Sequence, residues 1–432
     1  MLHHIVIVGG GAGGLELATR LGRTLGRRKQ AHITLVDCNL THVWKPLLHE
    51  VAAGSLNTTD NELNYLAQAK WNNFDFQLGR LTSLDRENKT IQLAATLDDK
   101  GVQLVPARSL AYDTLVLAIG SLTNDFGTPG ASEHCIFLDC LQSAQHFHQR
   151  LLGEYLSAHA RDGNNEQVSV AIVGAGATGV ELAAELRNAA KMLSDYGLDH
   201  IRPENMHISI LEAGPRILPA LSEKLATIVH QELLKLGVKV RLGARVKEVT
   251  AEGFVTAEGE LIPASLRVWA AGVRAPAFLR ELDGLETNRI NQLVVDSTLQ
   301  TSLDPDIFAI GDCAACPLEP GSSHNVPPRA QSAHQQASLL VKSLRLRLQN
   351  RPLPHYRYRD YGSLVSLSSY TAVGNLMGGF MHSVNLEGWL ARMFYISLYR
   401  MHQMVLYGRF RTLLLMLGDR IGKRTHPKMK LH

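Results

Sequence analysis

Two stretches of the chain share one pattern of hydrophobic and polar positions. Residues 4–21 read HIVIVGGGAGGLELATRL, and residues 170–186 read VAIVGAGATGVELAAEL. In both, a short β-branched run typical of a buried parallel strand leads into glycines spaced G-x-G-x-x-G. A segment rich in Ala, Leu and Glu follows and predicts a helix. The pattern therefore predicts two strand–turn–helix units of the same design.

The glycines of this pattern have distinct physical tasks. The first permits a tight turn, the second lets a pyrophosphate approach the backbone, and the third allows the helix to pack closely on the strand. The second strand of each unit ends in a carboxylate, which can accept hydrogen bonds from a ribose hydroxyl. The residues concerned are Gly9, Gly11, Gly14 and Asp37 in the first unit and Gly174, Gly176, Gly179 and Glu212 in the second. Two complete sets predict two dinucleotide sites rather than glycine turns without a ligand.

The acid of the second unit also bears on the choice of nucleotide. The Glu212 carboxylate would repel a 2′-phosphate, which favours NADH over NADPH. Arg216 lies close by in the sequence and could soften this preference.

Length and charge set bounds on the rest of the chain. With 432 residues it exceeds the size at which one hydrophobic core stops growing, so two or three domains are expected. The formal net charge of +4 is too small to indicate nucleic-acid binding. Positive charge is concentrated at one end, since residues 386–432 hold nine Lys or Arg against two acidic residues. No secretory signal is visible, and no uncharged apolar run reaches the ~20 residues of a membrane-spanning helix.

The cysteines are few and odd in number, which does not suggest a disulfide framework and favours a reducing, cytoplasmic setting. They are Cys38, Cys135, Cys140, Cys313 and Cys316. We expect Cys135 and Cys140 to be buried thiols, on opposite faces if their stretch is a strand. Cys313 and Cys316 form a C-x-x-C pair, for which ordinary thiols are the main expectation and a soft-metal or redox role stays open. No second pair completes a zinc site, so no metal is predicted.

At this point the chain resembles the flavoprotein reductases that contain two dinucleotide-binding folds. The stretches YDTLVLAIGS (112–121), RVWAAGVR (267–274) and TSLDPDIFAIGDCA (301–314) carry the resemblance further. It implies that the first unit holds FAD, with Asp312 on the ribityl chain and Gly120 and Gly272 where the chain passes between domains. The implied fold is α/β, with two Rossmann-like domains and a C-terminal helical segment. The expected boundaries are 1–120 and 290–345 for a split FAD domain, 165–285 for an inserted NADH domain and 346–432 for the C-terminal region.

Two more stretches resemble one branch of this family, the type II NADH dehydrogenases. They are THVWKPLLHEVAAG (41–54), which contains Lys45 and would lie against the flavin, and PPRAQSAHQQASLL (327–340). The resemblance implies that Gln331, His334 and Gln335 lie near the quinone head group or the isoalloxazine. Amides and an imidazole could donate to quinone carbonyls and supply protons. Glu181 would lie near the nicotinamide and the flavin, and Glu16 is its equivalent in the first unit.

The C-terminal region is expected to reach the membrane in which a quinone dissolves. Leu386, Trp389, Leu390 and Met393 form a helical stripe, and apolar and Arg residues alternate beyond it. The basic end would be attracted to anionic lipid, which predicts helices lying in the membrane interface. A buried helix pair or a homodimer seam is the alternative.

The sequence thus predicts a type II NADH dehydrogenase that passes two electrons from NADH through FAD to a membrane quinone. It would not pump protons and would be peripheral on the cytoplasmic face of the plasma membrane. Two alternatives remain. A sulfide:quinone oxidoreductase shares the architecture but needs cysteines at the flavin to carry sulfur, for which Cys38 and Cys135 are poor substitutes. A redox-sensing protein would hold FAD and NADH as a stable complex without turnover.

Overall fold

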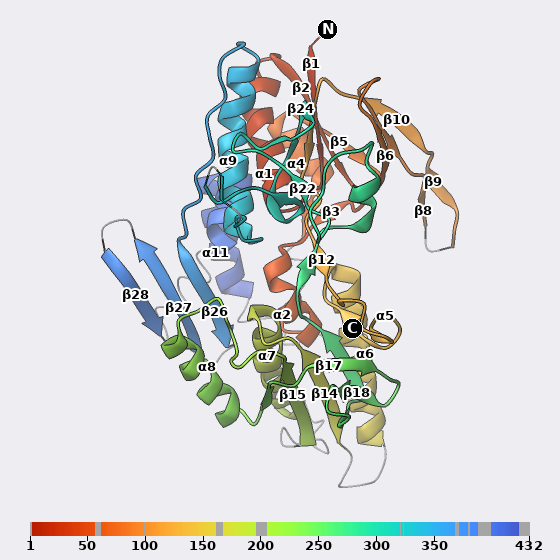
Figure 1. Ribbon diagram of the computed structural model, residues 1–432, viewed down its shortest axis with the longest axis vertical. Coiled ribbons are helices and arrows are strands. Elements are labelled where there is room, and N and C mark those ends of the chain that lie inside the picture. Colours follow the sequence, from red (N-terminus) through yellow and green to blue (C-terminus); the bar gives the residue numbers. More distant parts are fainter. Residues whose placement is uncertain are drawn as a thin grey trace.

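The computed structural model describes most of the chain. The described residues are 2–56, 62–98, 100–160, 167–195, 205–319, 321–322, 324–367, 371–378, 381–387 and 399–422. Two parallel sheets dominate it, one at each end of an elongated molecule (Figure 1). The predicted α/β fold is therefore confirmed.

The first sheet is built from two distant parts of the chain. Its strand order is β23-β24-β11-β1-β2-β5. The strands are β1 (His3–Val8), β2 (Ala31–Asp37), β5 (Asp75–Leu78), β11 (Thr114–Leu117), β23 (Gln300–Thr301) and β24 (Asp304–Ala309). All neighbours are parallel except β23 and β24. The apolar run in β1 is fully buried, as expected of a central parallel strand covered on both faces.

The second sheet repeats this arrangement with its own core. Its order is β13-β20-β14-β15-β16, and every pair is parallel. The strands are β13 (Ile136–Phe137), β14 (Val168–Val173), β15 (Met206–Glu212), β16 (Lys239–Leu242) and β20 (Leu266–Trp269). Helices α6 (Leu141–Ala160), α7 (Ala177–Asp195) and α8 (Glu223–Lys235) pack around it, and β17 (Val246–Val249), β18 (Gly253–Thr256) and β19 (Leu261–Pro263) form a separate antiparallel sheet.

Long helices and short elements complete the domains. Helix α1 (Ala12–Leu21) follows β1 and packs against α9 (Ala330–Arg347). The shorter elements are η1 (Gly22–Gly26), β3 (Thr41–His42), η2 (Lys45–Leu47), α2 (Leu48–Ala53), β4 (Leu63–Asn64), α4 (Tyr65–Asn72), β6 (Leu81–Asp85), β7 (Thr90–Leu93), β8 (Thr96–Leu97), β9 (Gln103–Val105), β10 (Arg108–Ala111), β12 (Leu122–Thr123), α5 (Ala131–His134), β21 (Val273–Arg274), η4 (Ala277–Glu281), β22 (Leu293–Val294), η5 (Gly311–Cys313) and β25 (Ala314–Ala315).

The C-terminal region contains a sheet that the sequence pattern did not predict. Strands β26 (Gly362–Leu367), β27 (Thr371–Gly378) and β28 (Met381–Glu387) form an antiparallel sheet. Its strand β26 packs against α7. The predicted helical stripe was wrong at its start, because Leu386 lies in β28 and pairs with Gly374. Its other members, Trp389, Leu390 and Met393, lie outside the described residues.

Two helices follow this sheet in the described residues 399–422. One spans 399–407 and the other is α11 (Arg409–Gly422). Within the part of the chain that the structure describes, neither these nor any other helix combines the length and apolar character needed to cross a bilayer.

Candidate functional site

The loop after β1 has the shape that its glycines predict. Gly9 has a φ of +104°, and a Cβ there would lie 2.3 Å from the Ala118 carbonyl oxygen. A Cβ on Gly14 would lie 1.9 Å from the Gly9 carbonyl oxygen. By contrast, a Cβ on Gly11 would meet no atom within 4 Å. The outer glycines are therefore required by packing, whereas the middle one leaves an open approach to the start of α1, as a bound pyrophosphate requires.

The loop after β14 has the same geometry. Gly174 has a φ of +102°, and its missing Cβ would lie 2.8 Å from Ala271. The corresponding Cβ on Gly179 would lie 2.0 Å from the Gly174 carbonyl oxygen, and that on Gly176 meets nothing within 4 Å. We call residues 9–14 with Asp37 the first cradle, and residues 174–179 with Glu212 the second cradle.

Each cradle is tied to its own strand-end carboxylate. Asp37 accepts hydrogen bonds from the Gly10 and Asn39 backbone N–H groups, at 2.7 and 2.8 Å. Glu212 accepts from the Ala175 and Gly214 backbone N–H groups, at 2.8 and 2.7 Å. The two carboxylates are thus placed identically beside their glycine loops, where the sequence pattern put a ribose.

Arg216 is occupied near the second cradle. Its guanidinium donates to the carbonyl oxygens of Leu221 and Pro219, both at 2.9 Å. It therefore holds the following loop in this structure.

Three segments converge beside the first cradle at Asp312. The Ser121 hydroxyl donates to the Asp312 carboxylate at 2.8 Å, and Lys45 Nζ donates to the Ser121 carbonyl oxygen at 3.1 Å. Burial raises the pKa of Asp312, and the Ser121 hydrogen bond and the Lys45 charge oppose that rise. Gly120 has a φ of +81° and open space at its missing Cβ. With the first cradle, this polar, partly open set fits the predicted FAD.

Gly272 immediately precedes β21. Its φ is +68°, and a Cβ there would lie 2.4 Å from the Phe126 ring. Strand β21 pairs antiparallel with β12, which comes from a distant part of the chain. Gly272 therefore has a packing reason in this structure, at the passage between domains that the sequence predicts.

The two predicted glutamines of α9, Gln331 and Gln335, bind segment 359–362 of the chain. Gln331 Nε2 donates to Asp360 Oδ1 and to the Gly362 carbonyl oxygen, at 3.2 and 3.1 Å. The Gln335 amide pairs with the backbone N–H and C=O of Arg359, at 3.0 and 2.8 Å. Both side chains therefore fasten segment 359–362 to α9, a structural task that the sequence did not predict.

His334 points instead towards α1. Its Nδ1 hydrogen-bonds the carboxylate of Glu16, which is fully buried, while 44% of the His334 side chain is exposed. Arg20 Nη1 donates to the other oxygen of Glu16 at 2.8 Å and also contacts the Ser338 hydroxyl. The structure thus joins the predicted His334 to the equivalent of Glu181 in the first unit.

Glu181 has very different surroundings on α7. It is 7% exposed, accepts a hydrogen bond from the Ser366 backbone N–H at 3.0 Å, and has His49 Nδ1 at 3.7 Å. Burial raises the pKa of Glu181 to about 8 and lowers the pKa of His49 to about 4. Burial thus favours the uncharged form of both groups at neutral pH, where α2, α7 and β26 meet.

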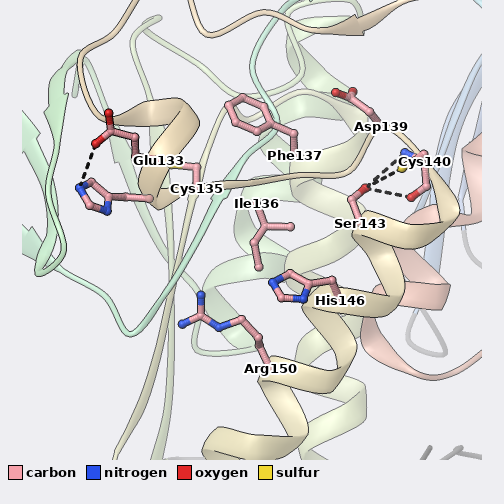
Figure 2. A pocket seen from close by; sticks show the side chains of 10 residues that line it. Glu133, Cys135, Ile136, Phe137, Asp139, Cys140, Ser143, His146 and Arg150 are labelled. Carbon is pink, nitrogen blue, oxygen red and sulfur yellow. Dashed lines mark hydrogen bonds and ion pairs between the residues drawn. The ribbon is translucent and has the colours of Figure 1, made fainter. Parts of the chain in front are cut away.

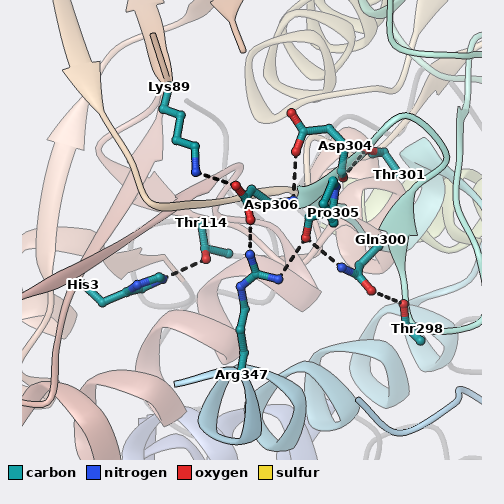
Figure 3. Close-up of polar contacts among 10 residues, drawn as sticks. All are labelled: His3, Lys89, Thr114, Thr298, Gln300, Thr301, Asp304, Pro305, Asp306 and Arg347. Carbon is teal, nitrogen blue, oxygen red and sulfur yellow. Dashed lines mark hydrogen bonds and ion pairs between the residues drawn. The ribbon is translucent and has the colours of Figure 1, made fainter. Parts of the chain in front are cut away.

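The far end of α9 is fixed by a charge cluster (Figure 3). The Asp306 carboxylate accepts from both Arg347, at the end of α9, and Lys89, beside β7. Arg347 also donates to the Pro305 carbonyl oxygen at 3.0 Å. These contacts hold α9 against β24, which keeps residues 331–335 in a set position at its other end.

One open pocket of about 390 Å³ lies elsewhere, where α5, β13 and α6 meet (Figure 2). Its lining includes Cys135, Cys140, His146 and Arg150, but none of the residues that the sequence predicts for the site. Cys135 and Cys140 do not share one strand, because β13 contains only residues 136–137, so the condition for placing them on opposite faces is not met. Cys140 was also expected to be buried and is exposed.

The C-x-x-C pair is packed inside the protein. Cys313 and Cys316 are both 0% exposed, and their sulfur atoms lie against backbone carbonyl oxygens. Burial raises the pKa of Cys313 to about 11, which keeps it a thiol. Among the described residues, no group of three His, Cys, Asp or Glu is arranged to hold a metal ion. These observations favour ordinary buried thiols.

Sequence reasoning missed a histidine pair beside the first cradle. His42 Nδ1 donates to the Gly10 carbonyl oxygen at 2.9 Å, and its Nε2 lies 3.2 Å from Nε2 of His402. The two histidines are 360 residues apart in the chain. Neither has the local spacing of a ligand motif, so no signal in the sequence joins them.

Comparison with known proteins places these features in a family. The family model described as pyridine nucleotide-disulphide oxidoreductase matches residues 3–337. A type II NADH:quinone oxidoreductase of Haemophilus influenzae is 46% identical over the whole of both chains. Another, from Staphylococcus aureus, is 28% identical over 87% of this chain and 90% of its own.

Solved structures show the same fold. The NDH2 of Plasmodium falciparum in complex with NADH superposes with a TM-score of 0.83 at 20% identity, over the whole of both chains. The sulfide:quinone oxidoreductase of Aquifex aeolicus gives a TM-score of 0.71 at 17% identity, over 94% of this chain and 92% of that one. The architecture is therefore common to enzymes with different electron donors, and the fold alone does not choose between them.

Proposed function

Because this chain belongs to the pyridine nucleotide-disulphide oxidoreductase family, as a type II NADH:quinone oxidoreductase, we propose that it transfers two electrons from NADH through FAD to a membrane quinone. The observation that carries the proposal is the pair of matching cradles, each with a pinned carboxylate. One cradle would hold the resident cofactor and the other the substrate. The proposed boundaries are 1–120 and 290–345 for the FAD domain and 165–285 for the NADH domain.

The residues around each cradle have separate tasks in this proposal. Bound FAD supplies the two-electron redox chemistry. Gly9, Gly11, Gly14, Asp37, Lys45, Gly120 and Asp312 would hold it, and Gly174, Gly176, Gly179, Glu212 and Gly272 would form the NADH side. Glu181, protonated at neutral pH, would donate a hydrogen bond or a proton between the domains.

The quinone side is assigned to the start of α9. His334 would hold a proton at its ring nitrogen for the quinone, because its Nδ1 is oriented by Glu16 and part of its ring reaches solvent. Gln331 and Gln335 would shape the site by holding segment 359–362 in place.

The decisive experiment follows the flavin absorbance of the purified enzyme in two steps. NADH should bleach the flavin, and a short-chain quinone should restore the absorbance and sustain many turnovers. Bleaching by sulfide but not by NADH would favour the sulfide:quinone alternative. A single reduction without turnover would favour the redox-sensing alternative.

The environments of Cys38 and Cys313 do not favour sulfide as the electron donor. A sulfur-carrying cysteine acts as a thiolate. Cys313 is buried with a raised pKa, and burial also raises the pKa of Cys38. Neither has the environment of a reactive thiolate.

We further propose that α11 lies on the membrane at the cytoplasmic face, as a peripheral attachment. Large apolar side chains project from it into solvent, with exposed fractions of 73% at Phe410, 55% at Leu413 and 53% at Leu417. Arg409 and Arg411 are also exposed and would meet anionic headgroups. Exposed apolar surface beside basic residues is typical of a helix lying in the interface.

A truncation tests this attachment. The chain ending at Gly408 should no longer float with anionic vesicles but should still reduce a water-soluble acceptor with NADH. Flotation of the truncated protein would contradict the proposal. If α11 forms a dimer seam instead, the truncation should change the mass measured by light scattering and leave flotation intact.

A further inference from the structure

Helix 399–407 is packed into the first domain rather than lying loosely beside it. Arg23, in η1, donates to the carbonyl oxygens of Val405 and Leu406, at 2.8 and 2.6 Å, and thereby caps the end of the helix. Leu406 is 1% exposed and belongs to the core of the first sheet. The Trp44 ring packs on His402 with 4.3 Å between ring centroids. Helix 399–407 is therefore part of the domain that carries the first cradle.

The contact of His402 with the first cradle has a defined polarity. A carbonyl oxygen only accepts, so His42 must carry its proton on Nδ1 to bond Gly10. Burial lowers the pKa of His42 to about 4, so at neutral pH its Nε2 is an acceptor. His402 Nε2, 3.2 Å away, must then be the donor. The row His402, His42, Gly10 thus runs in one direction, and its histidines are 4% and 3% exposed.

Both backbone polar groups of Gly10, in the first cradle, are hydrogen-bonded to side chains from other parts of the chain. Its N–H donates to Asp37 at 2.7 Å, and its carbonyl oxygen accepts from Tyr65 at 2.8 Å and from His42 at 2.9 Å. It lies between Gly9, held by packing, and Gly11, which leaves the open approach for a phosphate. Whatever orients the Gly10 peptide therefore also orients the binding face of the loop.

We propose that helix 399–407 is a working part of the FAD site, in which His402 positions the Gly10 peptide through His42 and so slows loss of the cofactor. Helix α11 continues from this helix after one residue, Gly408. Attachment of α11 to a lipid surface is then coupled to retention of FAD, and by linkage FAD favours attachment. The inference rests on the proposed FAD site and on the proposed membrane face of α11.

The first test measures the rate at which FAD fluorescence appears when the holoenzyme is diluted. His402→Leu leaves the buried His42 Nε2 without its donor, and should speed FAD release about tenfold. His402→Gln keeps an N–H donor and should restore a rate near that of the wild type. Gln403→Leu is the matched control, because Gln403 is a buried polar neighbour on the same helix that bonds Arg400. It should leave the rate unchanged.

A second variant guards against a folding defect in His402→Leu. Arg23→Gln loosens the end of the helix without touching either histidine, and should speed FAD release about threefold. Hydrogen exchange in 399–407 should rise in both variants and also in the FAD-free wild type. Equal release rates for the wild type, His402→Leu and Arg23→Gln would overturn the proposal.

The lipid arm uses vesicles of phosphatidylglycerol and phosphatidylcholine. They should slow FAD release from the wild type about threefold and have no effect on the chain ending at Gly408. Vesicles that leave the wild-type rate unchanged would overturn the coupling to lipid. A wild type that binds no FAD would instead overturn the proposed function, so the two failures are distinguishable.

Discussion

The two cradles are alike in their loops and unlike in what surrounds them. The backbone N–H of Gly9 donates to the Val36 carbonyl oxygen, and that of Gly174 donates to the Leu211 carbonyl oxygen, each at 2.8 Å. Val36 and Leu211 are the residues just before the strand-end acids. Seven positions after these glycines, Glu16 and Glu181 occupy the same turn of their helices. Yet Glu16 has Arg20 and His334 as partners, whereas Glu181 has a neutral His49 and one backbone N–H.

This difference arises from the elements that cover each helix. Helix α9 covers α1, while α2 and β26 cover α7. A repeated motif therefore reproduces a binding loop, but the chemistry of the helix behind it depends on its tertiary neighbours. Glu16 therefore joins an ionic network with Arg20 and His334, whereas the equivalent Glu181 in the second domain is buried and uncharged.

The largest difference between the cradles should come from replacing the third glycine of one cradle at a time with alanine. The added methyl of Gly14→Ala would lie 1.9 Å from the Gly9 carbonyl oxygen, so we expect a loss of about 3 kcal/mol and of bound FAD. Gly179→Ala should keep FAD but lose reduction by NADH. Flavin content and NADH bleaching measure the two effects.

The open middle glycines supply the control for these variants. The methyl added in Gly11→Ala and Gly176→Ala meets no atom within 4 Å, so without bound nucleotide both proteins should melt at the temperature of the nucleotide-free wild type. Each should weaken only its own nucleotide. If Gly14→Ala retained full flavin content and stability, the packing explanation would be wrong.

The difference between the glutamates is sharpened by pH. Folded Glu181 holds its proton up to about pH 8, whereas the unfolded chain releases it near 4.5, so this group loses stabilising effect as pH rises between those values. His49, with its pKa lowered to about 4, has the opposite slope below its ordinary value of 6.5. The net decline should therefore fall between pH 6.5 and 8, and amount to roughly 2 kcal/mol.

Thermal melting at pH 6.5 and pH 8 measures that decline. Glu181→Gln cannot ionise and should remove it. His49→Gln should leave the decline in place or enlarge it slightly, because folded His49 is uncharged over that window and the unfolded imidazole is at most half protonated, at its lower end. A decline of equal size in the wild type and Glu181→Gln would show that another group is responsible.

The smallest expected effect concerns a contact that only the first cradle has. The Tyr65 hydroxyl donates to the Gly10 carbonyl oxygen at 2.8 Å, and a Cβ at Gly10 would lie 2.4 Å from that hydroxyl. The second cradle has Ala175 at this position. Tyr65→Phe should cost about 1 kcal/mol, seen as roughly fivefold weaker FAD binding with unchanged KM for NADH. A change in KM for NADH alone would contradict this assignment.

Much of the site was accessible from the sequence because it is local. The repeated motifs, residues 4–21 and 170–186, hold the strand, the three glycines and the start of the helix within 18 consecutive residues or fewer, and the turn between strand and helix follows from that local pattern. The acids at the ends of β2 and β15 follow from the same pattern. The α/β fold and both nucleotide sites could therefore be predicted.

Only the tertiary structure decided the partners of the side chains. Glu16 and His334 are 318 positions apart, and nothing near either residue indicates the other. The amides of Gln331 and Gln335 hold segment 359–362, although the resemblance placed them near the quinone head group or the isoalloxazine. Backbone turns depend on neighbours in sequence, whereas burial, ionic partners and proton affinity depend on whichever distant segment packs against a helix.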